Sequence, residues 1–191
     1  MIKDKHLMIG LAASITILVL LVATMMAQIQ INKDSMRYGS GLELHLTADH
    51  YRNGVLLSSS YHAMSNTNYG KNWTANKITG FNNATWAYNA TYIGCSNSTA
   101  AFDATWTALP SEITTSGLTR AAATMTYTGL GTWNATVTFT ITATNSTRMY
   151  GYYIDSGASA TLIAAEQQGD GNQKNVLAGD TLIVTIQGTT T

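Results

Sequence analysis

The chain has 191 residues, ten basic and ten acidic side chains, and no formal net charge. Without a basic surplus it offers no surface suited to nucleic-acid phosphates, so composition argues against nucleic acid as a partner. Its single cysteine, Cys95, excludes an internal disulfide, and the fold must therefore be held together by other means.

The first element is a long stretch without charge, from Leu7 to Asn32. The part from Leu7 to Ala27 is close to the roughly 20 residues that cross a bilayer as a helix. Lys3 and Lys5 precede it, which favours an N-terminus in the cytoplasm and places the rest of the chain outside the membrane. We therefore expect an N-terminal hydrophobic α-helix in residues 1–34 and an extracellular domain in residues 35–191.

Three fates remain open for this helix: a cleaved secretory signal, a retained transmembrane anchor, or a helix packed in a filament core. A secretory signal would have a shorter apolar core, of about 7–15 residues, and small residues before the cut. The sequence before Gln28 is Thr-Met-Met-Ala instead. The apolar residues expected to make helix–helix contacts are Leu11, Ile15, Leu18, Val22 and Met25.

A hairpin is expected next. Leucine and alanine alternate with polar residues from Leu42 to Asp49, which indicates a strand with one apolar face. Asn53-Gly54 is the dipeptide that favours a tight two-residue turn. Val55 to Tyr61 is then the returning strand.

The clearest strand is predicted from Thr132 to Thr144, where apolar residues alternate with Asn134 and a row of threonines. Threonine suits both a solvated sheet face and the strand backbone. A strand at residues 123–128 should precede it. Further strands are expected at 150–154, 161–166 and 181–187, and residues 66–97 are interpreted as long loops. This pattern predicts a mostly β domain, an antiparallel β-sandwich.

The N-glycosylation pattern Asn-x-Ser/Thr recurs along the domain. It occurs at Asn72, Asn83, Asn89, Asn97, Asn134 and Asn145. An exported chain makes these asparagines candidate sites for N-linked glycans.

Residues with catalytic or metal-binding chemistry are sparse. His45 and Asp49 should share one strand face while His50 points to the other, so we interpret them as polar residues of a solvated face. Glu112 and Arg120 are interpreted as a structural ion pair that holds a loop. Residues 169–172 contain one Asp and one Asn that could contribute oxygen ligands to a calcium site. We expect no catalytic residues, no metal and no cofactor.

Two stretches resemble known families. Leu11 to Ile31, apolar all round and without interruption, resembles the N-terminal helix of archaeal type IV pilins. Within residues 42–187, short motifs resemble a β module of phage tail-fibre-like and archaeal surface proteins. The matching motifs are Tyr51-Arg52-Asn53-Gly54, Thr107 to Glu112, Gly117 to Ala121, the strand Thr132 to Thr144, and Gly179 to Val184. The resemblance implies an extracellular structural β domain.

Together these features predict a structural subunit of an extracellular, pilus-like surface filament of archaeal type. Its partners would be copies of itself in a helical homopolymer, the membrane before assembly or permanently, and N-linked glycans. In a second mode of assembly, the segment Gln28 to Met36 would complete a neighbour's sheet. The alternative functions are a monomeric membrane-anchored adhesin or carbohydrate-binding protein, with aromatic residues of 72–92 stacking on sugars, and a virion surface protein.

Overall fold

The computed structural model describes residues 42–79, 90–154, 160–167 and 173–190. The chain divides into two units, Met1–Ser40 and Gly41–Thr191, and only the second contains described residues. This second unit is mostly β with antiparallel sheets, as predicted, and it also contains one short helix that was not predicted. The expected N-terminal helix and its five packing residues lie outside the described residues, so the boundary at residue 34 stays a prediction.

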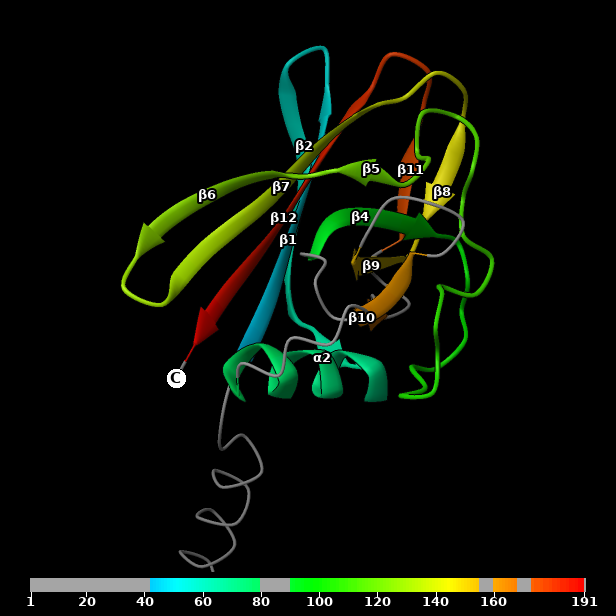
Figure 1. Cartoon of the computed structure of the whole chain (residues 1–191). Coiled ribbons are helices and arrows are strands. Elements are labelled where there is room, and N and C mark those ends of the chain that lie inside the picture. The colour runs from blue at the N-terminus through cyan, green and yellow to red at the C-terminus, as the bar shows by residue number, and fades with distance from the viewer. Residues whose placement is uncertain (1–41, 80–89, 155–159, 168–172, 191) are drawn as a thin grey trace, which may run out of the picture. The chain divides into compact units, whose positions relative to one another are not determined.

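Two five-stranded sheets form the second unit (Figure 1). The first sheet has the order β2-β1-β12-β7-β6: β2 (Val55–Ala63), β1 (Leu42–Arg52), β12 (Thr181–Thr190), β7 (Thr132–Thr140) and β6 (Thr124–Gly129). The second sheet has the order β3-β10-β9-β4-β5: β3 (Ser65–Asn66), β10 (Thr161–Gln167), β9 (Met149–Ile154), β4 (Ala90–Ser96) and β5 (Ala121–Ala122). A separate pair joins β11 (Lys174–Val176) to β8 (Asn145–Thr147).

The first sheet buries one face, as its alternating sequence predicts. Leu46, Val137 and Ile186 lie on three of its strands and are at most 4% exposed. They belong to one hydrophobic cluster with Ile93 and Tyr152 of the second sheet. On β7, the residues that alternate with the buried ones, including Thr136 and Thr138, lie on the opposite, partly exposed face of the sheet. The main core therefore combines side chains from both sheets.

The first hairpin forms where it was predicted. Asn53 and Gly54 both have positive φ, 51° and 78°, as a tight hairpin turn of the I′ type requires. The strand predicted to run to Thr144 ends at Thr140, so its last four residues were assigned wrongly. The reason is tertiary: the Ile141 N–H donates to the Asp180 carbonyl, and the Ile141 carbonyl accepts from Gly179.

The prediction of loops for residues 66–97 is wrong in two places, because this stretch contains α2 (Asn68–Thr79) and β4. The Thr67 hydroxyl accepts from the Gly70 N–H at 3.0 Å, which caps the first turn of α2. A Cβ at Gly70 would lie 2.0 Å from the Ile163 carbonyl oxygen, so only glycine lets the helix approach β10 this closely. Tyr69 and Trp73 pack against the core.

The Asn/Thr-rich sequence of helix α2 has no clear apolar stripe that would direct one side of it to the core. The contacts of its first turn with β10 and with the core therefore fix its position. Figure 1 shows it lying across one end of the sheets. In the part of the chain that the structure describes, no helix is long and apolar enough to cross a membrane.

Candidate functional site

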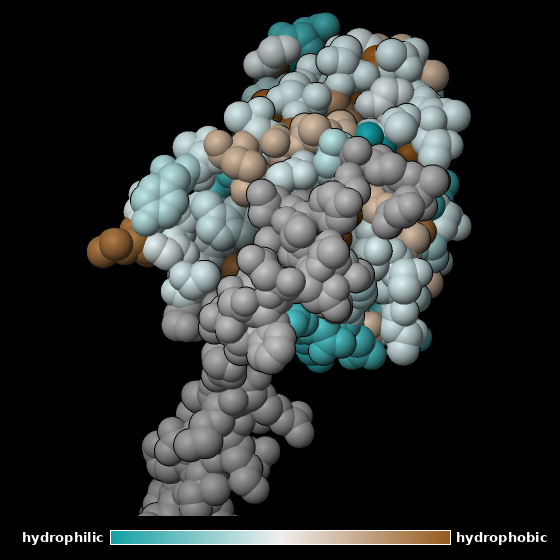
Figure 2. All heavy atoms as spheres, viewed as in Figure 1, coloured by the Kyte–Doolittle hydropathy of each residue, from teal (hydrophilic) through white to brown (hydrophobic). Residues whose placement is uncertain are grey.

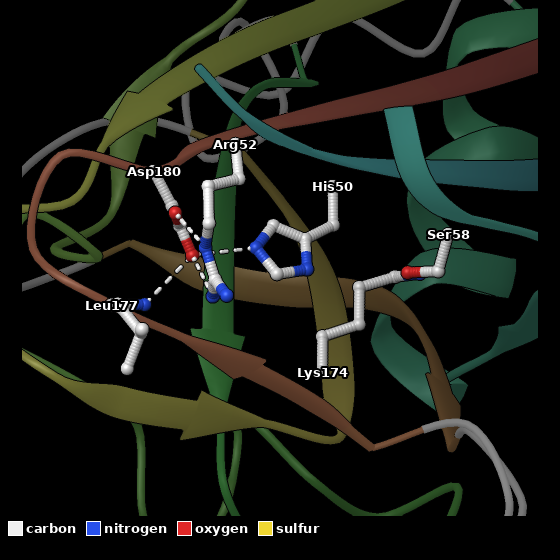
Figure 3. A network of polar contacts seen from close by, with 6 residues as sticks. All are labelled: His50, Arg52, Ser58, Lys174, Leu177 and Asp180. Carbon is white, nitrogen blue, oxygen red and sulfur yellow. Dashed lines mark hydrogen bonds and ion pairs between the residues drawn. The ribbon is translucent and has the colours of Figure 1, made fainter. Parts of the chain in front are cut away.

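A cluster of polar side chains gathers around Asp180 (Figure 3). Asp180 lies at the turn before β12, and its side chain is only 2% exposed. One carboxylate oxygen lies 2.7 Å from His50 Nε2, and Arg52 binds both oxygens, at 2.8 and 2.9 Å. The Leu177 N–H donates to the same carboxylate at 2.8 Å. We call these four residues the Asp180 network.

Backbone register explains why these residues meet although they are far apart in sequence. Strand β1 pairs antiparallel with β12, with His50 opposite Leu182 and Tyr51 opposite Thr181. The last residues of β1 therefore lie beside the turn that precedes β12. Gly179, with φ of 92°, makes that turn.

The charges of the Asp180 network satisfy each other. The Arg52 guanidinium, by hydrogen bonding, holds the pKa of Asp180 well below its usual range, and the Leu177 N–H and His50 act in the same direction. The same hydrogen bond raises the pKa of Arg52. A carboxylate with this many donors is a poor proton acceptor. Asp180 therefore ties β1 to the β11–β12 turn, and its geometry is that of a structural anchor.

Lys174 and Ser58 form a second contact close to this network, as Figure 3 shows. Lys174 is 4% exposed, and its Nζ donates to the Ser58 hydroxyl at 3.1 Å. Burial lowers the pKa of Lys174, while the charge of Asp49 opposes the shift. A lysine beside a serine can activate it only as the neutral amine. Here the Lys174 side chain donates to the hydroxyl, so the contact links β11 to β2.

The predicted pair of Glu112 and Arg120 is confirmed. Arg120 Nε and Nη2 donate to the two carboxylate oxygens of Glu112 at 2.8 and 2.5 Å. The guanidinium also lies 3.7 Å from the ring centroid of Tyr153, and the Tyr153 hydroxyl donates to Glu112 at 3.1 Å. That hydroxyl accepts in turn from the Leu109 N–H at 3.0 Å. These residues form a clamp that holds the segment after β4 against β9.

His45, Asp49 and His50 point as predicted, with His45 and Asp49 on one face of β1 and His50 on the other. The interpretation of His50 as part of a solvated face is wrong, however, because it is only 5% exposed and binds Asp180. His45 stacks on Tyr61 with ring centroids 5.2 Å apart. Within the described ranges no three His, Cys, Asp or Glu side chains form a metal site. The calcium candidate at 169–172 lies outside them.

The sequons fall in different environments. Asn72 on α2 and Asn97 after β4 are exposed. Asn134 near the start of β7 and Asn145 in β8 are half-buried, and Asn145 Nδ2 donates to the Ser116 hydroxyl at 3.1 Å. Asn83 and Asn89 lie outside the described residues. The structure thus separates the described sequons by the accessibility of their side chains.

Sequence reasoning missed the Asp180 network. His50 and Asp180 are 130 positions apart, and no local pattern connects a histidine at a strand end with an aspartate before another strand. The one signal was Asp180 itself, an acid in a chain with few charges, directly after a turn glycine. Cys95 is fully buried, and burial raises the pKa of its thiol strongly, so it is an unreactive core residue.

Comparison with known proteins gives no relative from which a function could be taken. The chain matches no protein-family model, and it matches neither a curated protein nor a solved structure.

Proposed function

We propose that the chain is a structural subunit of an extracellular, pilus-like surface filament. The observation that carries the proposal is the pairing of an uncharged apolar segment, Leu7 to Asn32, with a low-charge β unit. In the filament the segment forms an α-helix and packs with the helices of neighbouring copies. Before assembly the same helix lies in the membrane.

In this proposal the two sheets form an antiparallel β-sandwich displayed outside the cell. The outward face of its first sheet carries one threonine row across four strands, Thr47, Thr185, Thr136 and Thr124. Thr136 and Thr185 are hydrogen-bonded through their hydroxyls at 3.1 Å. Most of the surface seen in Figure 2 is pale, with few strongly hydrophilic groups. Hydroxyls and glycans, rather than charges, make this surface polar.

Electron microscopy tests the proposal directly. Surface material sheared from cells is examined by negative stain, and the protein is identified in the same fraction by mass spectrometry. Regular filaments that contain the chain are expected. Recovery of the chain only in membrane fragments would contradict the filament and favour a membrane-anchored protein.

The helix-packing role has its own test. Ile15→Asp and Val22→Asp together should abolish filaments, because two buried charges would face the neighbouring helices. Thr138→Asp is the matched control, since Thr138 is exposed on β7. Filaments in normal yield from the double variant would show that these residues do not pack in the filament core.

Glycosylation should follow the accessibility of the asparagines. Asn72 and Asn97 are exposed, whereas the Asn145 amide is hydrogen-bonded to Ser116. We expect Asn97→Gln to lower the intact mass by one glycan, and Asn145→Gln to leave it unchanged apart from the substitution. An intact mass equal to that of the bare chain would exclude glycosylation altogether.

Two of the aromatic residues that the adhesin alternative would use, Trp73 and Tyr92, lie among the described residues. Trp73 packs against the main core, and Tyr92 packs against the second cluster. Both rings are half-buried and offer less of a face to a sugar than the pattern predicted. Specific binding on a glycan array would nevertheless favour that alternative, because a filament subunit need not bind any glycan there.

A further inference from the structure

Within the described residues, strand β2 is an edge of the first sheet. It is the last strand in the order β2-β1-β12-β7-β6, so β1 is its only neighbour within the described structure. It has nine residues, whereas the edge strands of the second sheet, β3 and β5, have two each. Natural edges are usually protected by charges, prolines or shortness. The β2 sequence, Val-Leu-Leu-Ser-Ser-Ser-Tyr-His-Ala, has no proline, lysine or acid.

The side chains of β2 are unusually apolar for their exposure. Val55 and Tyr61 are 62% and 61% exposed, and Leu56 and Leu57 are both 49% exposed. Large apolar groups on an open edge strand favour pairing with another strand. Of these four residues, Tyr61 lies in the part of β2 that pairs regularly with β1.

Among the described residues, alternate backbone groups of β2 point away from β1. The Met64 N–H donates to the Leu44 carbonyl at 2.8 Å. In an antiparallel ladder the direction of hydrogen bonding alternates along the strand. Ser59, Tyr61 and Ala63 therefore direct their backbone N–H and C=O groups away from β1. The pairing of β2 with β1 is regular from Ala63 back to Ser58. A register shift follows there and leaves Leu57 as the extra residue of a β-bulge.

We propose that β2 pairs with β2 of a second copy of this chain, antiparallel about a two-fold axis at Tyr61. Ser59 of each copy then lies opposite Ala63 of the other, and the two first sheets become one continuous sheet. The register uses only the regular part of the strand and leaves the bulge at Leu57 outside the interface.

Charge and strand direction both favour a second copy as the partner. The chain carries no net charge and β2 carries no ionised acid, lysine or arginine, so two identical strands meet without repulsion. The first sheet is antiparallel throughout, so its two edge strands, β2 and β6, run parallel to each other. Joining β6 of one copy to β2 of the next by translation would give a parallel pair. A two-fold axis joins β2 to β2 in the antiparallel arrangement, which is slightly more stable per residue.

Disulfide capture tests the pairing in the full-length chain. In the proposed register the two Tyr61 Cα atoms lie about 5.5 Å apart, within the roughly 4.4–6.8 Å that a disulfide spans. Tyr61→Cys should give a covalent dimer on a non-reducing gel after mild oxidation in detergent. The native Cys95 is 0% exposed and does not compete. Tyr127→Cys is the matched control, because Tyr127 is a tyrosine on the other edge strand and is 71% exposed.

The dimer yield should be several-fold higher for Tyr61→Cys than for Tyr127→Cys. Adding Ser59→Lys and Ala63→Lys to Tyr61→Cys should reduce the yield to the control level, because like charges then face each other across the pair. Equal yields from the two single variants would overturn the proposal.

The segment Gln28 to Met36 is an alternative occupant of the β2 edge. Mixing two single variants, Tyr61→Cys and Ile31→Cys, distinguishes it from a second β2. A mixed disulfide that exceeds the Tyr61 homodimer would overturn self-pairing and show that the segment Gln28 to Met36 occupies the edge. The β2 pairing does not rest on the filament proposal. Capture of the dimer without filaments would support the pairing alone, and filaments without capture would remove the pairing and leave the filament standing.

Discussion

In the first sheet, β1, β7 and β12 bury one face and leave the other partly solvated, whereas in the second sheet all six residues of β9 are buried. The difference comes from residues 97–120, which lie between β4 and β5 and which we call the covering segment. Its Phe102, Trp106 and Leu109 pack with Met149 and Leu162 in a second hydrophobic cluster. A loop without regular structure thus supplies the outer layer of the second sheet.

Threonine-rich strands and apolar strands differ in how much of their surface the rest of the chain must cover. The first sheet can face water because threonine hydroxyls satisfy its outer surface. The second sheet has Tyr150, Tyr152 and Tyr153 in one strand, all at most 1% exposed, and needs cover on both faces. The clamp between Glu112, Arg120 and Tyr153 holds that cover in place.

The largest expected effect is therefore in the second sheet. Tyr153→Ala should lower the free energy of unfolding by about 4 kcal/mol, because it opens a cavity and leaves the Leu109 N–H without its acceptor. Thr138→Ala on the exposed face of the first sheet should change it by less than about 0.5 kcal/mol. Urea unfolding of both variants measures the difference. Similar losses would show that the two sheets are equally buried after all.

The next effect concerns the end of the first sheet. Asp180→Asn should cost about 2–3 kcal/mol at neutral pH, because Arg52 and His50 lose a charged acceptor. The folded-state pKa of Asp180 is lowered, mainly by Arg52. Its contribution is therefore complete above its unfolded value of roughly 3.9 and is lost as the pH falls below it.

Thermal unfolding of Asp180→Asn and the unsubstituted chain should accordingly differ at pH 7 and converge in strong acid. A constant difference at every pH would mean that the carboxylate charge contributes nothing to stability.

A smaller loss is expected from the clamp on the covering segment. Glu112→Gln keeps the shape of the side chain and removes its charge, and should cost about 2 kcal/mol. It should also increase proteolysis within residues 97–120, because the segment then opens more often. Thr140→Gln, at an exposed position of the first sheet, is the control. Unchanged cleavage would show that apolar packing alone holds the segment.

A pH-dependent effect is expected from Glu166 in β10. Burial raises its pKa to about 7, so the folded state binds this proton more tightly than the unfolded chain does. Stability should therefore fall as the pH rises from the ordinary glutamate value, roughly 4.3, towards 7, and level off above that. Glu166→Gln should remove this part of the pH dependence in a series of thermal melts. A variant with the same pH profile as the unsubstituted chain would contradict it.

Strand patterns and turn chemistry could be predicted from the sequence because they are local. The alternation from Leu42 to Asp49, the Asn53-Gly54 turn and the alternation after Thr132 each follow from side-chain period and backbone preference within a few residues. The pairing of Glu112 with Arg120 could also be predicted from the sequence, because few other charges are nearby along the chain.

Long-range contacts decided the rest. Helix α2 forms from an Asn/Thr-rich stretch because Thr67 caps it and Gly70 meets the Ile163 carbonyl. Strand β7 ends at Thr140 because Ile141 bonds to the turn at Gly179 and Asp180. The Asp180 network depends on the register between β1 and β12, which no local pattern encodes. The sequence by itself determined which segments have one apolar face, and only the tertiary structure decided which far-apart polar groups would meet when those faces were buried.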